Sequence, residues 1–254
     1  MPCQLTDVIA ELDKLLQPGR FKDYCPNGLQ VPGGAKVAKV ATGVSASAEL
    51  FERAIAEHAD LLVVHHGLFW GSGPTPIDAR MKRRLKLLFD ADMSLAAYHL
   101  PLDAHLQMGN NALIARALGA DTLESFAMHE GEPIGFVARF AGEGIEATNL
   151  FARVATLTER TPLVFDAGPA RVHSVAIVSG AGNDYLADAV AAGADAFLTG
   201  EPAERVMTEA REAPIHFIAA GHYATETLGV KRLGEHLSEH FDVEHMFIDV
   251  PNPI

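Results

Sequence analysis

Two stretches of this chain repeat one order of elements, and that repeat is the strongest constraint on its fold. Residues 37–67 read VAKVATGVSASAELFERAIAEHADLLVVHHG, and residues 172–201 read VHSVAIVSGAGNDYLADAVAAGADAFLTGE. Each stretch gives a strand-like run, a small polar turn, a helix-like run, an Ala-Asp pair and an apolar strand with a polar end. Strands that alternate with helices indicate right-handed βαβ units. We therefore predict an α/β fold of two similar lobes with largely parallel sheets.

The segments around the repeat extend the alternation. Helix-like patterns cover residues 7–16, 77–91 and 110–118, and a strand-like run covers residues 94–98. Residues 121–172 are less regular: we expect a strand within 131–142, a helix over 145–158 and a short strand at 161–165. The first run of βα units ends near Leu123. We therefore predict lobes at 1–123 and 124–254, which together form one compact unit.

Composition and charge exclude several classes of function. The net charge is −13, and the basic run MKRRLK falls on a predicted helix, where a solvated face is its simplest interpretation. Nucleic-acid binding depends on neutralising phosphates, so a nucleic-acid partner is disfavoured. Cys3 and Cys25 form neither a disulfide framework nor a CxxC clamp, which favours a reducing compartment. Acidic residues interrupt the N-terminal segment and no run reaches membrane-spanning length, so we expect a cytoplasmic protein without a membrane partner.

The polar ends of the repeated strands coincide when Asp60 is aligned with Asp195. This alignment places His66 opposite Glu201, and a separate alignment of the following strands, AAYHLPLD (96–103) with AAGHYATE (219–226), places His99 opposite His222 and Asp103 opposite Glu226. Open parallel sheets bind their ligands in a crevice at the carboxyl ends of their strands. We therefore expect these side chains to line one crevice between the lobes.

The residue types at these ends suit a metal site. His65 and His66 follow four aliphatic residues. We expect Gly67 to let the chain turn there, so that both imidazoles can bind metal ions. Gly221 supplies a second turn, after which His222 and Glu226 lie one helical turn apart. Imidazoles and carboxylates without a thiolate favour zinc, manganese or iron. Such a donor set suits two ions ~3.5–4 Å apart that activate a shared water, which is hydrolytic chemistry.

The predicted metal ligands are His65, His66, Asp103, His222 and Glu226. His99 and Glu201 are candidates for proton transfer or substrate contact. The remaining histidines lack a spaced partner at a glycine-marked strand end, and we interpret them as surface or core residues. The chain contains no GxxxxGK[ST] phosphate loop, no complete dinucleotide fingerprint and no GxSxG elbow.

The motifs NGLQV, VVHHGLFW, YHLPLDAH, GADAFLTGE and GHYATETLGV occur in that order and resemble the Nif-three-like family, the GTP cyclohydrolase I type 2 homologues. The resemblance runs from about Cys25 to the C-terminus, and all five predicted ligands match it. It implies a dinuclear metal site, two α/β lobes and a toroidal homohexamer. The length of 254 residues leaves no room for the inserted domain of longer members.

Two functions of different classes fit these features. The first is a dinuclear metal-dependent hydrolase that acts on a small polar or nucleotide-like substrate through an activated water. The second is a non-catalytic, metal-binding ring that serves as a scaffold or handles metal. A third interpretation, an architectural ring on nucleic acid, conflicts with the charge of −13.

Overall fold

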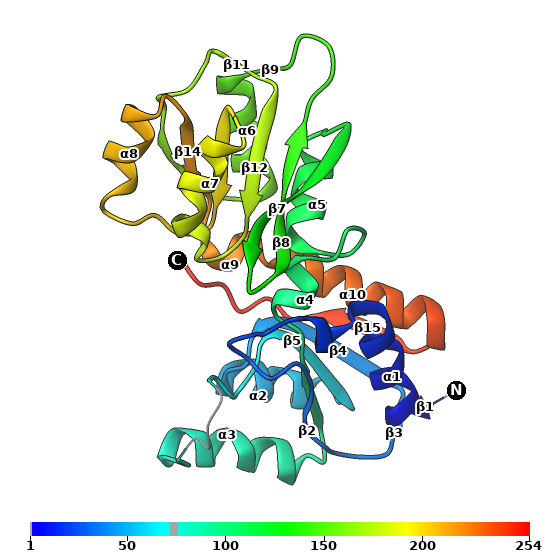
Figure 1. Cartoon of the computed structure of the whole chain (residues 1–254). Helices are drawn as coiled ribbons and strands as arrows, with labels where there is room; N and C mark the ends of the chain where they lie inside the picture. The colour runs from blue at the N-terminus through cyan, green and yellow to red at the C-terminus, as the bar shows by residue number, and fades with distance from the viewer. Residues whose placement is uncertain (1, 72–75) are drawn as a thin grey trace. The chain divides into compact units, whose positions relative to one another are not determined.

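A computed structural model describes residues 2–71 and 76–254 (Figure 1). Contacts divide the chain into two compact units, Met1–Leu102 with Gly229–Val250, and Asp103–Leu228 with Pro251–Ile254. The sequence places its boundary near Leu123 because the first βα units end there. The contact division differs because the C-terminal helix and the strand after it pack with the N-terminal half of the chain, as their orange and red colours among the blue elements show in Figure 1.

The first unit is built on a five-stranded sheet in the order β15-β4-β5-β6-β2. Its strands are β2 (Gly28–Val31), β4 (Lys39–Ser45), β5 (Leu61–His66), β6 (Ser94–Ala97) and β15 (Glu244–Phe247). All neighbours are parallel except β2, which pairs with β6 in the antiparallel sense. Its helices are α1 (Leu5–Leu16), η1 (Pro18–Arg20), α2 (Ala48–Ala56), α3 (Ala79–Asp90) and most of α10 (Thr227–Phe241). A small antiparallel pair joins β1 (Cys3–Gln4) to β3 (Lys36–Val37).

Helices cover both faces of this sheet because its central strands are apolar on both sides. One face packs on α2 and α3, and a Cβ on Gly43 would touch the side chain of Leu50 on α2. The other face packs on α10, where a Cβ on Gly234 would collide with the ring of His245 on β15. Thr42 on β4 lies on that same face, since its hydroxyl lies 2.9 Å from His245 Nε2.

The second unit is built on a six-stranded mixed sheet in the order β10-β14-β13-β12-β8-β7. Its strands are β7 (Thr122–His129), β8 (Glu132–Arg139), β10 (Leu163–Phe165), β12 (Ser174–Val178), β13 (Ala196–Thr199) and β14 (His216–Ala219). The central strands β12, β13 and β14 are parallel, and antiparallel strands flank them. A short antiparallel pair joins β9 (Ile145–Glu146) to β11 (Arg171–Val172).

The helices of the second unit also lie on both faces of its sheet. α5 (Asn110–Ala117) and α6 (Ala147–Leu157) share one apolar core with the sheet. η2 (Gly182–Tyr185), α7 (Leu186–Ala191) and α8 (Val206–Glu212) follow the parallel strands, and α7 and α8 contact β13 and β14. Two one-turn helices complete the chain, α4 (Leu100–Asp103) and α9 (His222–Thr225). The predicted α/β fold with largely parallel strands is confirmed.

The sequence missed several strands, among them β2, β7 and β15, and the helix α8, and it misplaced some element ends. β7 lies in the irregular middle segment, where its alternation is interrupted by positive φ at Ala127. β15 follows the last helix directly and is only four residues long. The helix predicted from Asp7 begins at Leu5, and α6 begins after a two-residue strand. Within the described residues, no helix combines the length and the apolar character that crossing a membrane requires.

The aligned aspartates of the repeat make the same contacts in both units. Asp60 Oδ2 accepts from the backbone N–H groups of Ala38 (2.7 Å) and Lys39 (2.9 Å), where β4 begins. Asp195 Oδ2 accepts from His173 N (2.7 Å) and Ser174 N (3.0 Å), where β12 begins. Each carboxylate thus satisfies donors at the start of one strand while its own backbone leads into the next strand. The repeat in the sequence is therefore also a repeat of hydrogen bonding.

We expect Asp195→Ala to lower the free energy of unfolding of the second unit by about 1–3 kcal/mol, because the donors at His173 and Ser174 lose their acceptor. Asp60→Ala should have the same effect in the first unit. Urea unfolding measures both, with Asp188→Ala, an exposed aspartate on α7, as the control. Equal stability of Asp195→Ala and the control would contradict the assigned role.

Candidate metal centre

Three histidines gather at the carboxyl ends of β5 and β6 in the first unit. His65 and His66 end β5, and His99 follows β6. Their ring centroids lie 4.7 Å (His65–His66), 4.9 Å (His65–His99) and 5.5 Å (His66–His99) apart. One ring nitrogen from each lies within 4.8 Å of the other two. This spacing follows from the register, because β5 and β6 are parallel neighbours and their ends meet at one edge of the sheet.

The protein holds His65 and His66 by their Nδ1 atoms. His65 is fully buried, and its Nδ1 lies 3.0 Å from the carbonyl oxygen of Tyr98. A carbonyl only accepts, so His65 Nδ1 carries the proton and Nε2 is the lone-pair nitrogen of the neutral ring. His66 Nδ1 lies 2.9 Å from the hydroxyl of Ser45, its register partner on β4. Such contacts orient an imidazole so that Nε2 can bind a metal ion.

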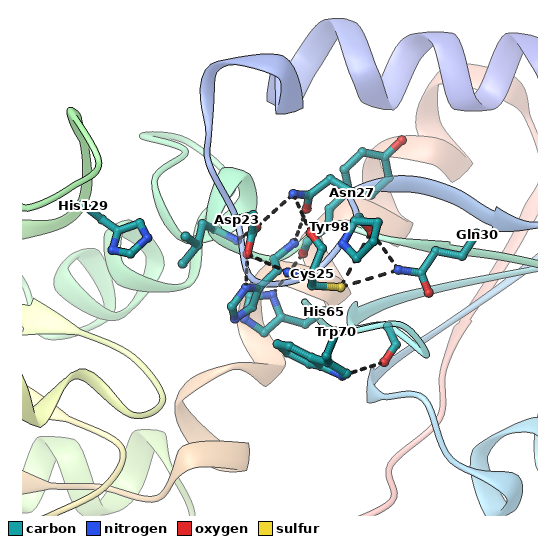
Figure 2. Close-up of polar contacts among 12 residues, drawn as sticks. Asp23, Cys25, Asn27, Gln30, His65, Trp70, Tyr98 and His129 are labelled. Atoms are coloured by element: carbon teal, nitrogen blue, oxygen red, sulfur yellow. Dashed lines mark hydrogen bonds and ion pairs between the residues drawn. The ribbon is translucent and has the colours of Figure 1, made fainter. Parts of the chain in front are cut away.

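His99 is held by the loop that precedes β2. Its Nδ1 lies 2.7 Å from Asp23 Oδ1, and its backbone N–H donates to Asn27 Oδ1 at 2.7 Å. The second oxygen of Asp23 accepts from Asn27 Nδ2 and from Leu100 N, both at 2.9 Å. Figure 2 shows Asp23 and Asn27 beside this cluster. The contacts fix the His99 ring to the scaffold as firmly as its two neighbours.

Asp23 is an ionised carboxylate in a nearly closed environment. Its side chain is only 3% exposed, and burial alone would raise its pKa. The hydrogen bond and charge of His99, together with Asn27 and Leu100 N, outweigh burial and lower the pKa to about 2. An acceptor that is charged at neutral pH keeps the proton on His99 Nδ1 and directs Nε2 toward the cluster.

Gly67 serves a purpose other than the predicted one. Its φ lies outside the left-handed region, so the strand does not need a glycine there in order to turn. A Cβ at this position would instead lie 2.3 Å from Gln30 Nε2. Gln30 (labelled in Figure 2) is held at both ends of its amide. Its Nε2 donates to Pro26 O at 2.7 Å, and its Oε1 accepts from Leu68 N at 2.8 Å. Gly67 thus leaves room for the Gln30 side chain, which crosses directly over it.

Two partly exposed aromatic rings lie beside the histidines. Trp70 is 46% exposed, and its ring centroid lies 5.8 Å from His66 and 5.4 Å from His99. Tyr24 is 56% exposed and lies 6.4 Å from His99. Exposed aromatic faces can stack on planar rings. The first unit therefore combines imidazole donors with surfaces that suit a flat, apolar group.

The second unit carries its own donors at the end of β14. Gly221 has φ 97°, which turns the chain into α9 and confirms its predicted role. His222 Nε2 lies 3.2 Å from Glu226 Oε2, and His222 Nδ1 bonds to Glu201, which follows β13. Burial lowers the pKa of His222, but the bonds and charges of Glu226 and Glu201 outweigh it and raise the pKa to about 9. The unit thus stabilises a positive charge between two carboxylates.

Asp103 is buried and fixed by neutral donors. Its Oδ1 accepts from Asn110 Nδ2 at 2.9 Å and from Ser179 Oγ at 3.1 Å. Asn111 adds contacts to the backbone, since its Nδ2 lies 3.3 Å from Asp103 O and its Oδ1 accepts from Ser179 N at 2.7 Å. Ser179 comes directly after β12, so Asp103 is tied to the carboxyl end of the parallel strands.

Gly180 links these two parts of the second unit. It follows Ser179, has φ 63°, and donates its N–H to Thr225 Oγ1 at 3.1 Å. A Cβ on Gly180 would lie 2.3 Å from Glu226 Oε1 and 3.1 Å from His222 Nε2. The glycine therefore leaves space in which the Glu226 carboxylate and the His222 ring can approach the backbone.

These residues fit divalent metal ions by their chemistry. The donors are imidazoles whose Nδ1 atoms are already bound and carboxylates that the protein orients, without a thiolate among them. The structure groups His65, His66 and His99 in the first unit, and His222, Glu226 and Glu201 in the second. Asp103 joins the second group through Ser179.

The sequence reasoning missed the side chains that hold the donors. Asp23, Ser45 and Gln30 were not singled out, although Gln30 lies within NGLQV. Their partners are 76, 21 and 38 residues away along the chain. In the sequence these three residues are polar side chains far from these partners, and their polarity is the only sign of their role.

We expect Asp23→Asn to lower the free energy of unfolding by about 2 kcal/mol at pH 7, because the amide cannot replace the ionised acceptor of His99. The native pKa is depressed, so this stability is complete above about pH 4 and is lost as the pH falls through about 2. The difference between the two proteins should therefore shrink in acid. Denaturant unfolding between pH 3 and 7 measures it, and Asp90→Asn, in an exposed pair with Lys86, is the control. A variant as stable as the parent at pH 7 would contradict this role.

Comparisons with known proteins agree with the resemblance seen in the sequence. The profile of the family described as Duf34/NIF3 (NGG1p interacting factor 3) matches residues 3–253. Proteins named GTP cyclohydrolase 1 type 2 homolog are 43% identical over 255 residues in Pseudomonas aeruginosa (100% of both chains) and 41% identical over 250 residues in Escherichia coli K12 (98% of both). A crystal structure from Thermus thermophilus matches with a TM-score of 0.92 at 39% identity, covering 99% of this chain and 100% of that one. This chain belongs to the Duf34/NIF3 family.

Proposed function

We propose that this chain is a metal-dependent hydrolase that acts on a small polar or nucleotide-like substrate. In this proposal His65, His66, Asp103, His222 and Glu226 together bind two divalent ions of zinc, manganese or iron. The observation that carries the proposal is the common anchoring of the imidazoles: His65, His66 and His222 each have Nδ1 bound to a backbone carbonyl, a hydroxyl or a carboxylate.

That anchoring is what a metal site needs and a packing cluster does not. A histidine that only fills space has no reason to turn the same nitrogen away from its neighbours, whereas a ligand must present one nitrogen in a fixed direction. His222 adds an electrostatic argument, because two carboxylates stabilise a cation at this position. A pair of divalent ions would supply a water of lowered pKa and stabilise negative charge that develops on the substrate.

Other residues of the chain have distinct roles in this proposal. Glu201 holds the His222 ring and can accept a proton through it. His99, bound to the ionised Asp23, can hold or deliver a proton at Nε2. Trp70 and Tyr24 offer partly exposed faces on which a planar ring can stack. These features favour a substrate with a flat heteroaromatic group, and the names of the relatives suggest GTP as the first compound to test.

We expect the candidate centre of metal-loaded protein to hold about two divalent ions per chain, measured by plasma mass spectrometry as the metal that the parent retains and Glu226→Gln does not. Glu226→Gln should lose most of this metal and at least about 100-fold in kcat/KM, because the amide has no charge with which to bind the ions. The assay is formate release and loss of guanine absorbance from GTP, followed by a panel of nucleotides and phosphate esters. Glu143→Gln, whose side chain is 91% exposed, is the control.

Retained turnover in Glu226→Gln, with its fold intact by circular dichroism, would contradict the catalytic proposal. Two ions per chain without turnover on any compound would instead favour the metal-binding scaffold.

The same preparations test the expected homohexamer by native mass spectrometry, because metal removal should dissociate the ring in the scaffold interpretation. The expectation of a cytoplasmic location rests on the acidic residues in the N-terminal segment and the lack of an apolar run of membrane-spanning length, and Cys3 and Cys25 favour a reducing compartment.

Gly180→Ala should weaken metal binding about 10–100-fold, because the added methyl group would displace the Glu226 carboxylate and the His222 ring. Gly142→Ala is the matched control: its φ of 65° is close to the 63° of Gly180, yet no atom lies within 4 Å of its added Cβ. Both variants place alanine at a similar positive φ, so a difference in metal affinity reports mainly the collision. Equal affinity in the two variants would show that Gly180 does not shape the site.

A further inference from the structure

A second group of metal-binding side chains lies in the first unit, away from the strand ends. It consists of Glu11 on α1 and of His236 and His240 on α10. One ligand atom of each lies within 4.8 Å of the other two. None of the three belongs to the motifs that identify the family resemblance. The group therefore requires an explanation of its own.

The spacing on α10 is that of a helical chelate. His236 and His240 are four residues apart, so their side chains lie one above the other on a single face. Their ring centroids are 5.7 Å apart with an angle of 33° between the planes. His236 Nε2 lies 3.1 Å from Glu11 Oε1 on the neighbouring helix. Ligands of a tetrahedral zinc ion lie ~3.3–3.5 Å apart at their usual bond lengths, so this pair is already near the required separation.

Glu11 is the charged donor of the group. Contacts with His236 and the charges of Lys14 and His240 outweigh burial and lower the pKa of Glu11, so its carboxylate is ionised at neutral pH. Lys14 Nζ lies 3.7 Å from Glu11 Oε2, but its side chain is 81% exposed and can turn into solvent. Burial differs within the group: the side chains of Glu11 and His236 are 16% and 17% exposed, while His240 is exposed. An ion can therefore enter from solvent on the His240 side.

We propose that Glu11, His236 and His240 form a binding site for a single zinc-type divalent ion, with water in the fourth position. Two imidazoles and one carboxylate form a donor set that zinc accepts in tetrahedral geometry. The ion would join α1, near the N-terminus, to α10, which returns to the first unit from the other end of the chain. Binding to the folded state alone would stabilise this connection in proportion to the metal concentration. The proposal is independent of the proposed hydrolase.

The test compares zinc binding of metal-stripped parent protein and His240→Ala by equilibrium dialysis with plasma mass spectrometry. We expect His240→Ala to bind one ion fewer per chain and to lose part of the rise in Tm that zinc produces in the parent. His58→Asn is the matched control, because it removes an exposed imidazole of the same unit at a position with φ 57°, which asparagine tolerates. It should bind zinc as the parent does.

Glu11→Gln provides a second variant, since it keeps the shape of the side chain and removes only its charge. It should weaken the same ion without loss of helical signal in circular dichroism. Glu226→Gln should leave this ion bound, so failure of the hydrolase proposal and failure of this site give different results. Identical zinc stoichiometry and Tm response in the parent and in both His240→Ala and Glu11→Gln would overturn the proposal.

Discussion

The hydrogen bond at Nδ1 of each candidate histidine is the interaction on which the site depends. It turns Nε2 in one direction and restrains the ring before any ion arrives, and for His65 the carbonyl acceptor also selects the tautomer. The partners differ: a backbone carbonyl for His65, a hydroxyl for His66, and carboxylates for His99 and His222. The result is the same in each case. An imidazole positioned in this way loses little entropy when it binds a metal ion.

The parallel strands explain why these partners are within reach. In both units the strands begin at an aspartate that accepts two backbone N–H groups, Asp60 in the first and Asp195 in the second. The opposite ends of those strands carry the polar residues. At one end of each sheet these hydrogen bonds fix the start of a strand, and the other end presents side chains for chemistry. The repeat shows the same division of roles in both units.

The sequence predicts the architecture well where local pattern determines it. Strands that alternate with helices and the repeat around Asp60 and Asp195 give the α/β fold, and the histidines and acids at strand ends give the candidate donors. The sequence does not predict the features that depend on contacts between residues far apart along the chain. β15 is too short to show a pattern and exists because β4 offers it an edge. The sequence suggests that Gly67 allows a turn, whereas in the structure the missing side chain of Gly67 leaves room for the side chain of Gln30. The anchors Asp23 and Ser45 could not be found, because only the folded chain brings them to their histidines, Asp23 from a loop and Ser45 from the neighbouring strand β4.

The central claim is that His65, His66, Asp103, His222 and Glu226 share two divalent ions, and anomalous diffraction tests it most directly. Crystals grown with zinc should be measured above and below the zinc absorption edge. The account predicts two anomalous peaks per chain at the candidate centre, with ligand atoms of His65, His66, His222 and Glu226 about 2.0–2.2 Å from one or the other. A fully loaded crystal without a peak within that distance of these four residues would contradict it and leave the anchored histidines as structural groups.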